Sequence, residues 1–288
     1  MTYIEARGLR KHYGATVALD GVDLRIDEGR IVGLIGPNGA GKTTALNAIV
    51  GLTTYDGTLS VLGRDPWEHR DELVRDVGFI TDVAVLPRWI RISQALDFVA
   101  GVHTRFDRAK AEAFLAKTSI TPASTVSQLS KGMVTQLHLA IVMAIDARVL
   151  VLDEPTLGLD LLYRKQFYDT LLTDFLERPR TVIVATHHVE EVEHVLTDVL
   201  FINRGRIVLN RTMDEIESRY LELLVHPDKL SAARALRPIA ERPGVGHSVL
   251  MFESMDRAQL AAFGETHRPR VADLFVAVVG GATPGAAS

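Results

Sequence analysis

The sequence contains no cysteine, which excludes disulfide bonds, thiolate metal sites and cysteine nucleophiles. This absence fits a reducing compartment such as the cytosol. An excess of basic residues is also missing, because 32 lysines and arginines stand against 36 aspartates and glutamates. The formal net charge of -4 therefore gives no electrostatic indication of a nucleic-acid partner.

Long apolar runs are absent as well. Stretches such as VLVLD and LFVAVVGGA are far shorter than the roughly 20 residues that cross a bilayer. The first residues, MTYIEARGLRKHYG, carry charges every few positions, so we expect no signal peptide. Any role at a membrane is expected to come through a separate membrane protein.

Strand and helix patterns alternate along the chain. Strand patterns dominate residues 2–35 and return in TLSVLG, VGFIT, ARVLVLDEP and RTVIVATHH. Helical spacing is typical of residues 90–146 and of LLYRKQFYDTLLTDFLE, which separates the last two of these strands. Strands that alternate with helices favour a parallel sheet, and a final hairpin is predicted around Arg204 and Gly205.

The 288 residues are enough for one large and one small domain. We expect a first domain over residues 1–220, with a helical insert at about 90–146. A small domain with strand-helix-strand-helix order is expected over 221–280, and a flexible tail over 281–288.

A glycine-rich loop follows the strand pattern RIVGLIG and precedes a helical pattern. Its sequence, GPNGAGKTT, fits the phosphate-loop pattern G-x-x-x-x-G-K-[ST]. Glycines allow backbone N–H groups to surround a phosphate, and the helix that follows adds a positive partial charge. A plain strand-to-helix turn is the structural alternative. The residues expected to bind nucleotide are Gly36, Pro37, Asn38, Gly39, Ala40, Gly41, Lys42, Thr43 and Thr44.

Within this loop, Lys42 is expected to reach the β- and γ-phosphates. The Thr43 hydroxyl is placed as a Mg²⁺ ligand. The strand pattern VLVLDEP ends in two adjacent acids, Asp153 and Glu154, for which we predict metal binding and general-base catalysis, respectively. Two solvated acids at the end of a strand are the alternative.

His187 follows another strand pattern, in ATHH. The carboxyl ends of parallel strands form the edge where ligands bind in open α/β sheets. His187 is therefore expected to contact the γ-phosphate, although a single histidine can also have a purely structural role. Further motifs are LSKGM, with Ser130 at the head of an apolar helix, and TLGLD, which ends at Asp160.

The order of these motifs resembles the nucleotide-binding subunits of ATP-binding cassette (ABC) transporters, over about residues 3–219. The resemblance implies an α/β fold with a P-loop NTPase core, a mixed sheet, an antiparallel β subdomain and a helical insert. The expected C-terminal α/β appendage would follow this core. In this family LSKGM corresponds to the signature motif, which implies that Ser130 and Gly132 bind the γ-phosphate of ATP held by a second subunit.

Other residues receive roles from the same resemblance. Tyr13 matches an aromatic residue that stacks on adenine, with a core contact as the alternative. Asp160 matches a loop that links the two sites of the dimer, with a helix N-cap as the alternative, as for Ser130. Asp82 stands where the family usually has a glutamine near Mg²⁺, and here a turn aspartate is the alternative. Lys131 and Met133 depart from the commonest signature.

The resemblance implies an ATPase that uses ATP and Mg²⁺ and forms a head-to-tail dimer with a second copy. A separate transmembrane permease, exporting drug, antibiotic or lipid-like cargo, would hold it at the cytoplasmic face of the membrane. Asp82 and the helical insert are expected at the permease contact. A soluble cassette ATPase acting on the ribosome or nucleic acid is the main alternative, and a phosphotransferase is a third.

Overall fold

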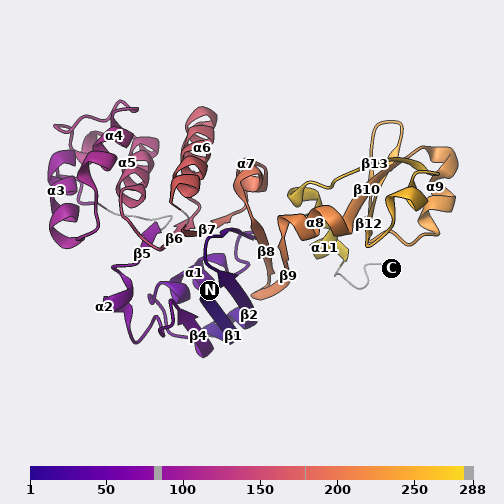
Figure 1. Ribbon diagram of the computed structural model, residues 1–288, viewed down its shortest axis with the longest axis horizontal. Coiled ribbons are helices and arrows are strands. Elements are labelled where there is room, and N and C mark those ends of the chain that lie inside the picture. Colours follow the sequence, from indigo (N-terminus) through magenta and orange to yellow (C-terminus); the bar gives the residue numbers. More distant parts are fainter. Residues whose placement is uncertain (81–85, 179, 282–288) are drawn as a thin grey trace.

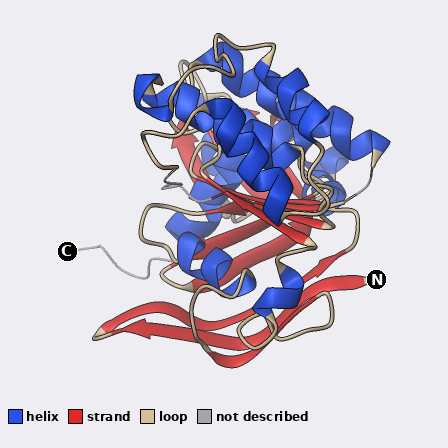
Figure 2. Ribbon diagram, turned by 90° about the vertical axis from the view of Figure 1, so that its left-hand side faces the viewer, coloured by secondary structure: helices blue, strands red, loops and turns tan. Residues whose placement is uncertain are grey.

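A computed structural model describes residues 1–80, 86–178 and 180–281 of the protein. The chain forms three sheets, and its helices gather mainly on one side of the largest sheet (Figures 1 and 2). The α/β architecture expected from the sequence is confirmed, including the mixed sheet, the antiparallel sheet and the C-terminal appendage.

The central sheet has six strands in the order β5-β6-β7-β3-β8-β9. The first five strands are parallel, and β9 pairs with β8 as an antiparallel hairpin. Arg204 and Gly205 form the turn of that hairpin with φ of 48° and 75°, which confirms the predicted position. The strands are β3 (Ile31–Ile35), β5 (Val77–Ile80), β6 (Val149–Asp153), β7 (Thr181–Thr186), β8 (Asp198–Asn203) and β9 (Arg206–Thr212).

Both faces of the central sheet are buried, as the continuous apolar strands require. In β6, Val149 and Val151 face a core shared with the antiparallel sheet, whereas Leu150 and Leu152 face the helices. The antiparallel sheet has the order β2-β1-β4 and contributes to the first core together with α1 (Lys42–Ile49). Its strands are β1 (Thr2–Tyr13), β2 (Thr16–Asp27) and β4 (Asp56–Val61).

The helical insert has a core of its own around Leu96, Leu115 and Leu137. Asp107 caps its second helix by accepting a hydrogen bond from the backbone N–H of Lys110 at 3.0 Å. The insert consists of α3 (Ile92–Val102), α4 (Arg108–Leu115), the 3₁₀ turn η1 (Val126–Gln128) and α5 (Lys131–Met143).

Three further helical segments complete this part of the molecule: α6 (Leu161–Glu177), α7 (Val189–Val192) and the 3₁₀ turn η2 (Glu193–Val195). A short helix, α2 (Arg70–Leu73), lies before β5 and has no clear signal in the sequence. Within the residues that the structure describes, no helix has both the length and the apolar character needed to cross a bilayer.

The C-terminal appendage contains more elements than the four expected. The additional strands β11 and β13 flank the predicted pair, and a last helix, α11, follows them. Helix α8 (Met213–Arg219) leads into the appendage, whose elements are β10 (Tyr220–Val225), α9 (Pro227–Arg234), β11 (Ala240–Pro243), β12 (Ser248–Glu253), α10 (Arg257–Leu260), β13 (Gly264–His267) and α11 (Val271–Gly281). Residues 282–288, which make up most of the expected tail, lie outside the described residues.

Helix α11 returns from the appendage to the central part of the molecule. The ring of Phe275 packs edge-on against Phe201 of β8, with centroids 5.1 Å apart. The backbone N–H of Val271 donates to Glu193 Oε1 at 2.9 Å. The appendage therefore shares an apolar core with the central sheet in addition to its own core around Leu223 and Phe252.

Candidate active site

The loop of residues 36–44 joins β3 to α1, and its path requires glycine at defined positions. Gly39 and Gly41 have φ of 78° and 108°, a region that disfavours any residue with a Cβ atom. A Cβ on Gly36 would stand 2.3 Å from the carbonyl oxygen of Ile202. The loop is therefore held close to β8 while its backbone remains curved.

A cavity of about 340 Å³ lies against this loop. Its wall is formed by residues 16–18, residues 37–44, Asp153 and Glu154. Tyr13 pairs with Thr16 in the hairpin next to this wall, and its side chain is 51% exposed. The alternative of a core contact for Tyr13 is therefore wrong, and the ring is accessible beside the cavity.

Lys42 is buried at the start of α1, with its ammonium group turned back onto the loop. Its Nζ donates to the carbonyl oxygens of Gly36 at 2.7 Å and Pro37 at 3.3 Å. Burial lowers the pKa of Lys42 below its ordinary value, while the negative charges of Glu154 and Asp153 oppose this shift. A phosphate that enters the loop would compete for these ammonium protons.

Thr43 and Asp153 form a pair of oxygen donors next to the lysine. The Thr43 hydroxyl donates to Asp153 Oδ2 at 2.7 Å, although 110 positions separate the two residues. Asp153 is the last residue of β6 and is 2% exposed. Mg²⁺ is usually bound by one or two carboxylates together with phosphate oxygens, so this donor pair fits it.

Glu154 has a strained backbone that directs its carboxylate toward the loop. Its φ of 46° is unusual for a residue with a side chain, and such strain often marks functional positions. The Thr186 hydroxyl donates to Oε2 at 3.1 Å, and the Lys42 ammonium lies 3.7 Å from Oε1. The carboxylate is thus held by two fixed neighbours.

His187 makes two contacts with the same carboxylate. Its backbone N–H and its ring Nδ1 lie 3.1 Å and 2.8 Å from Glu154 Oε1. An ionised carboxylate oxygen only accepts, so Nδ1 carries the proton in this contact, and the neutral ring has a lone pair on Nε2. Donation from Nε2 to a phosphate therefore requires the doubly protonated ring or release of the Nδ1 contact.

Strand order explains why these residues meet. Strand β7 lies between β6 and β3, and all three run parallel, so their carboxyl ends share one edge. The phosphate loop follows β3, Glu154 follows β6, and His187 follows β7. The structure therefore brings together the predicted phosphate loop, acidic pair and histidine.

Ser130 and Gly132 lie in a second cluster at the head of α5. The Ser130 hydroxyl accepts from the backbone N–H of Met133 at 3.2 Å and so caps the helix. Asp160 likewise caps α6 by accepting from the backbone N–H of Tyr163 at 3.0 Å. Both residues are thus N-caps, as the structural alternatives predict, and capping leaves their other expected roles open. The described residues that line the phosphate-loop cavity include neither Ser130 nor Gly132.

The turn of residues 157–160 packs directly on the head of α5. The Thr135 hydroxyl donates to the carbonyl oxygen of Leu157 at 3.2 Å. Arg164 holds the other side of the turn, because it donates to Leu159 O at 2.8 Å and to Glu191 Oε1 at 2.5 Å. The head of α5, this turn and the start of α7 therefore form one connected unit.

Several residues of the site have no distinct signal in the sequence. Thr186, Arg164 and Glu191 act on partners that are distant along the chain, so spacing does not indicate their contacts. Thr186 could have been noticed only as the neighbour of His187 in ATHH. Asp82, the predicted metal ligand, lies outside the described residues.

Replacing Gly132 by alanine is expected to destabilise the protein. The added Cβ would stand 2.8 Å from the carbonyl oxygen of Gly158, so the turn or the helix has to move. Overpacking of this kind costs about 1–3 kcal/mol in the free energy of unfolding. Urea unfolding monitored by circular dichroism measures the change.

Gly101→Ala is the matched control for this substitution. Gly101 lies in α3, and a Cβ there meets no heavy atom within 4 Å. Because alanine favours helix, the control is expected to be neutral or stabilising by up to about 1 kcal/mol. Equal stability of the two variants would contradict tight packing between α5 and residue 158.

Comparison with known proteins places these features in one family. The family profile described as "ABC transporter" matches residues 19–157. The daunorubicin resistance ATP-binding protein DrrA3 of Streptomyces coeruleorubidus is 32% identical over 249 residues, which cover 83% of this chain and 78% of that protein. The Nod factor export ATP-binding protein I of Cupriavidus metallidurans is 30% identical over 304 residues, covering 96% and 97% of the two chains.

Solved structures agree with this assignment. An ATP-binding subunit of an ABC transporter superposes with a TM-score of 0.68 at 25% identity, covering 75% of this chain and 92% of that chain. A bacterial ABC transporter cassette whose structure is dimeric has the same fold, with a TM-score of 0.67 at 22% identity and coverage of 73% and 98%. The chain belongs to the family of ABC transporter ATP-binding proteins.

Proposed function

We propose that this protein binds ATP with Mg²⁺ and hydrolyses it to power a separate transmembrane permease. The observation that carries the proposal is the group formed by Lys42, the Thr43–Asp153 pair, Glu154 and His187. These residues come from three strand ends; all but His187 line the cavity of the phosphate loop, and His187 contacts Glu154. They provide phosphate binding, a metal-binding oxygen pair and a candidate base in one place.

In this proposal, residues 36–44 surround the phosphates and Tyr13 stacks on the adenine. Lys42 leaves the carbonyl oxygens of Gly36 and Pro37 and pairs with the β- and γ-phosphates. Thr43 and Asp153 would hold Mg²⁺, which would offset negative charge on the phosphates. Asp82 would add a further oxygen ligand to this metal.

Glu154 is the proposed general base. Its carboxylate is held between Thr186 and His187, so it can accept a proton from a water molecule without moving far. His187 positions that carboxylate through Nδ1 and contacts the γ-phosphate. Release of the Nδ1 contact would free a ring N–H to donate to that phosphate.

We further propose a head-to-tail dimer in which each ATP is bound between two chains. Ser130 and Gly132 of one copy contact the γ-phosphate held by the other, and the turn that ends at Asp160 links the two sites. In support, Ser130 is exposed at a helix N-terminus, where anions bind favourably. Leu161 and Leu162, immediately after this turn, are 77% and 63% exposed and would be covered in such a dimer.

The permease contact is proposed on the helical insert and the segment around Asp82. Trp89, Phe98 and Val102 expose 76%, 65% and 65% of their surface. Phe98 and Val102 are four residues apart and lie on one face of α3. A membrane protein with a complementary apolar surface would cover them and hold the protein at the cytoplasmic face of the membrane.

Export of a drug, antibiotic or lipid-like compound is the proposed direction and cargo class. The relatives named for daunorubicin resistance and Nod factor export support this class. An ATPase acting on the ribosome or nucleic acid is not favoured, because the chain has no basic excess. We therefore expect no nucleic-acid partner.

We propose that residues 1–220 form the ATPase domain, with the helical insert at about 90–146, and that residues 221–280 form a small accessory domain. The four-stranded sheet and separate core of the appendage support this division. Its role is proposed to be regulation or support of the dimer. Residues 281–288 would form a flexible tail.

We expect the permease to be lost from the purified complex when the exposed face of α3 is made polar. Tagged protein isolated from detergent-solubilised membranes should retain an integral membrane protein with several spans. The double variant Phe98→Ser, Val102→Ser removes apolar contact area, so recovery of that partner should fall about tenfold or more. Quantitative mass spectrometry of the purified complexes measures this change.

Leu176→Ser is the control, because Leu176 is 71% exposed on α6, outside the helical insert. It should leave the recovered partner unchanged. ATP binding by both variants should equal that of the wild type. Recovery of ribosomes or DNA in place of a membrane protein would reject the transporter function.

A further inference from the structure

A second cavity, of about 340 Å³, lies at the edge of the central sheet opposite the phosphate loop. Arg148, in its wall, immediately precedes the first residue of β6, and Arg180 immediately precedes β7. The site residues Asp153, Glu154 and His187 stand at the other ends of these two strands. The two cavities therefore lie at opposite ends of strands β6 and β7.

Basic side chains dominate the wall of this second cavity. Two carboxylates, Asp107 and Asp146, are also in the wall. Helix α4 and the segment before it contribute from the helical insert. The residues immediately before β6 and β7, and the residue after α6, contribute from the sheet side. The five cations are Arg105, Lys110, Arg148, Arg178 and Arg180.

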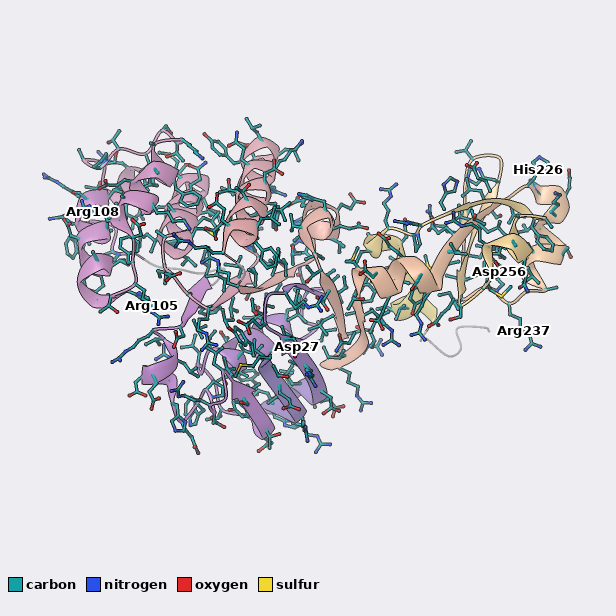
Figure 3. The ribbon with its side chains drawn as sticks, viewed as in Figure 1. Asp27, Arg105, Arg108, His226, Arg237 and Asp256 are labelled. Carbon is teal, nitrogen blue, oxygen red and sulfur yellow. The ribbon has the colours of Figure 1, made fainter. Side chains whose placement is uncertain are left out.

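Nearby carboxylates neutralise part of this charge. Asp174 accepts from both Lys110 and Arg180, and Asp76 accepts from Arg105 at 2.5 Å. With these two acids, the two in the wall and Glu28, which accepts from the Tyr3 hydroxyl at 2.7 Å, five carboxylates stand near the five cations, so what matters is which cations lack a close acidic partner. Figure 3 shows Arg105 at the base of the helical insert, on the side of the strands.

Arg148 and Arg178 are the cations with the weakest pairing to acids. Arg148 is exposed, stacks over the ring of Tyr3 at 4.7 Å and donates to its hydroxyl at 2.9 Å. The Arg178 side chain is 69% exposed, and within the described residues it pairs with Asp146 alone, at 3.9 Å. Arg178 can therefore turn toward an anion at little cost, whereas Arg148 would exchange its hydrogen bond to Tyr3 for one to the anion.

Arg180 is buried beneath them, with 7% of its surface exposed. Its two Nη groups donate to Ile145 O and Asp174, but its Nε has no hydrogen-bond acceptor within the described part of the chain. Burial lowers the pKa of Arg180 to about 10, and the group is still charged at neutral pH. A buried N–H without an acceptor is uncommon in native proteins.

We infer that this cavity binds a small phosphorylated molecule, recognised by Arg148, Arg178 and Arg180 around its phosphate group. Planar guanidinium groups match the geometry of phosphate oxygens and bind them with two hydrogen bonds each. The volume is at the lower end of the range for ligand pockets, which suits a compact phosphate ester rather than a large nucleotide.

Such a ligand would connect the helical insert to the sheet. The two parts already meet here, because Arg105 donates to Asp76, just before β5, at 2.5 Å, and Arg180, just before β7, donates to Ile145 O at 3.1 Å. Helix α5 runs from Ser130 at one end to the wall of the cavity at Ala144. A bound phosphate would therefore restrict the movement of α5 relative to the sheet.

Calorimetric titration with inorganic pyrophosphate tests the inference. The background is Lys42→Ala without nucleotide, because this variant removes the main cation of the phosphate loop. One pyrophosphate should bind per chain, and Arg148→Gln with Arg178→Gln should weaken it about tenfold or more. Hydrogen exchange at the backbone amides of Asp107 and Asp146 should slow several-fold on binding.

Arg70→Gln with Arg257→Gln is the matched control, because it removes two exposed arginines from other parts of the surface. It should bind pyrophosphate like its parent. The inference would be overturned if pyrophosphate did not bind to the Lys42→Ala parent. It would also be overturned if the Arg148 and Arg178 double variant bound pyrophosphate as tightly as that parent. Arg178→Gln alone, at an exposed position, keeps the test valid if the double variant unfolds.

Vesicles that contain phosphatidic acid distinguish a soluble ligand from a lipid headgroup. The Lys42→Ala parent and the Arg148 and Arg178 double variant should associate equally with these vesicles. Vesicle binding that depends on these arginines, without pyrophosphate binding, would assign the cavity to a lipid and overturn the inference. None of these measurements requires ATP hydrolysis, so they remain separate from tests of the proposed function.

Discussion

Replacing Glu154 by glutamine is expected to lower the rate of ATP hydrolysis by roughly 10²- to 10⁴-fold, the usual contribution of a general base. Glutamine has nearly the same shape, and its carbonyl oxygen can still accept from Thr186. Its amide cannot take a proton from water at neutral pH. ATP binding should persist, because Lys42 and the loop of residues 36–44 are unchanged.

The variant should also accumulate dimers in the presence of ATP, because the bound nucleotide is no longer consumed. Phosphate release measures turnover, and size-exclusion chromatography with light scattering measures the dimer. Glu177→Gln is the control, since Glu177 is exposed at the end of α6 and should retain wild-type turnover. Undiminished hydrolysis by Glu154→Gln would remove Glu154 from the role of base.

Replacing Ser130 by aspartate is expected to abolish ATP-driven dimerisation while leaving ATP binding by the single chain intact. Aspartate caps helices as well as serine does, and its charge suits the N-terminus of α5, so the fold should be preserved. In the proposed dimer, however, its carboxylate would face the γ-phosphate of the other copy. A carboxylate and a phosphate placed next to each other in this interface would repel each other strongly.

Ser130→Asn is the matched control, because asparagine provides the same cap without the charge. Both variants are best measured in the Glu154→Gln background, where dimers accumulate. The aspartate variant should dimerise at least about tenfold less, whereas the asparagine variant should stay close to its parent. Equal dimerisation of the two variants would place Ser130 away from the nucleotide of the partner copy.

The phosphate loop and the acidic pair could be predicted because their signals are local. Residues 36–44 form one contiguous motif after a strand, and Glu154 follows a strand of five buried residues. The same holds for Ser130, whose capping role depends on residues three positions away. Each of these predictions needs little information about distant parts of the chain.

Contacts between distant segments could not be predicted in this way. Nothing in the spacing indicates that Thr186 donates to Glu154, or that Arg164 donates to Glu191. Strands β11 and β13 have four residues each and lack an apolar alternation, since AERP and GETH are mostly polar or exposed. Their pairing with β12 and β10 arises from the neighbouring strands rather than from their own propensity.

By itself, the sequence determined the chemical inventory of this protein: a phosphate loop, an acidic strand end, a histidine and a capped signature helix, in the order of one family. Tertiary structure alone decided which of these groups meet. Strand order places Lys42, Glu154 and His187 at one edge of the sheet and leaves Ser130 in a separate cluster. It also gathers arginines from the insert and from two strand starts into the second cavity. The physical reason is that hydrogen-bonded pairing of strands is non-local, whereas motifs and caps are recorded within a few neighbouring residues.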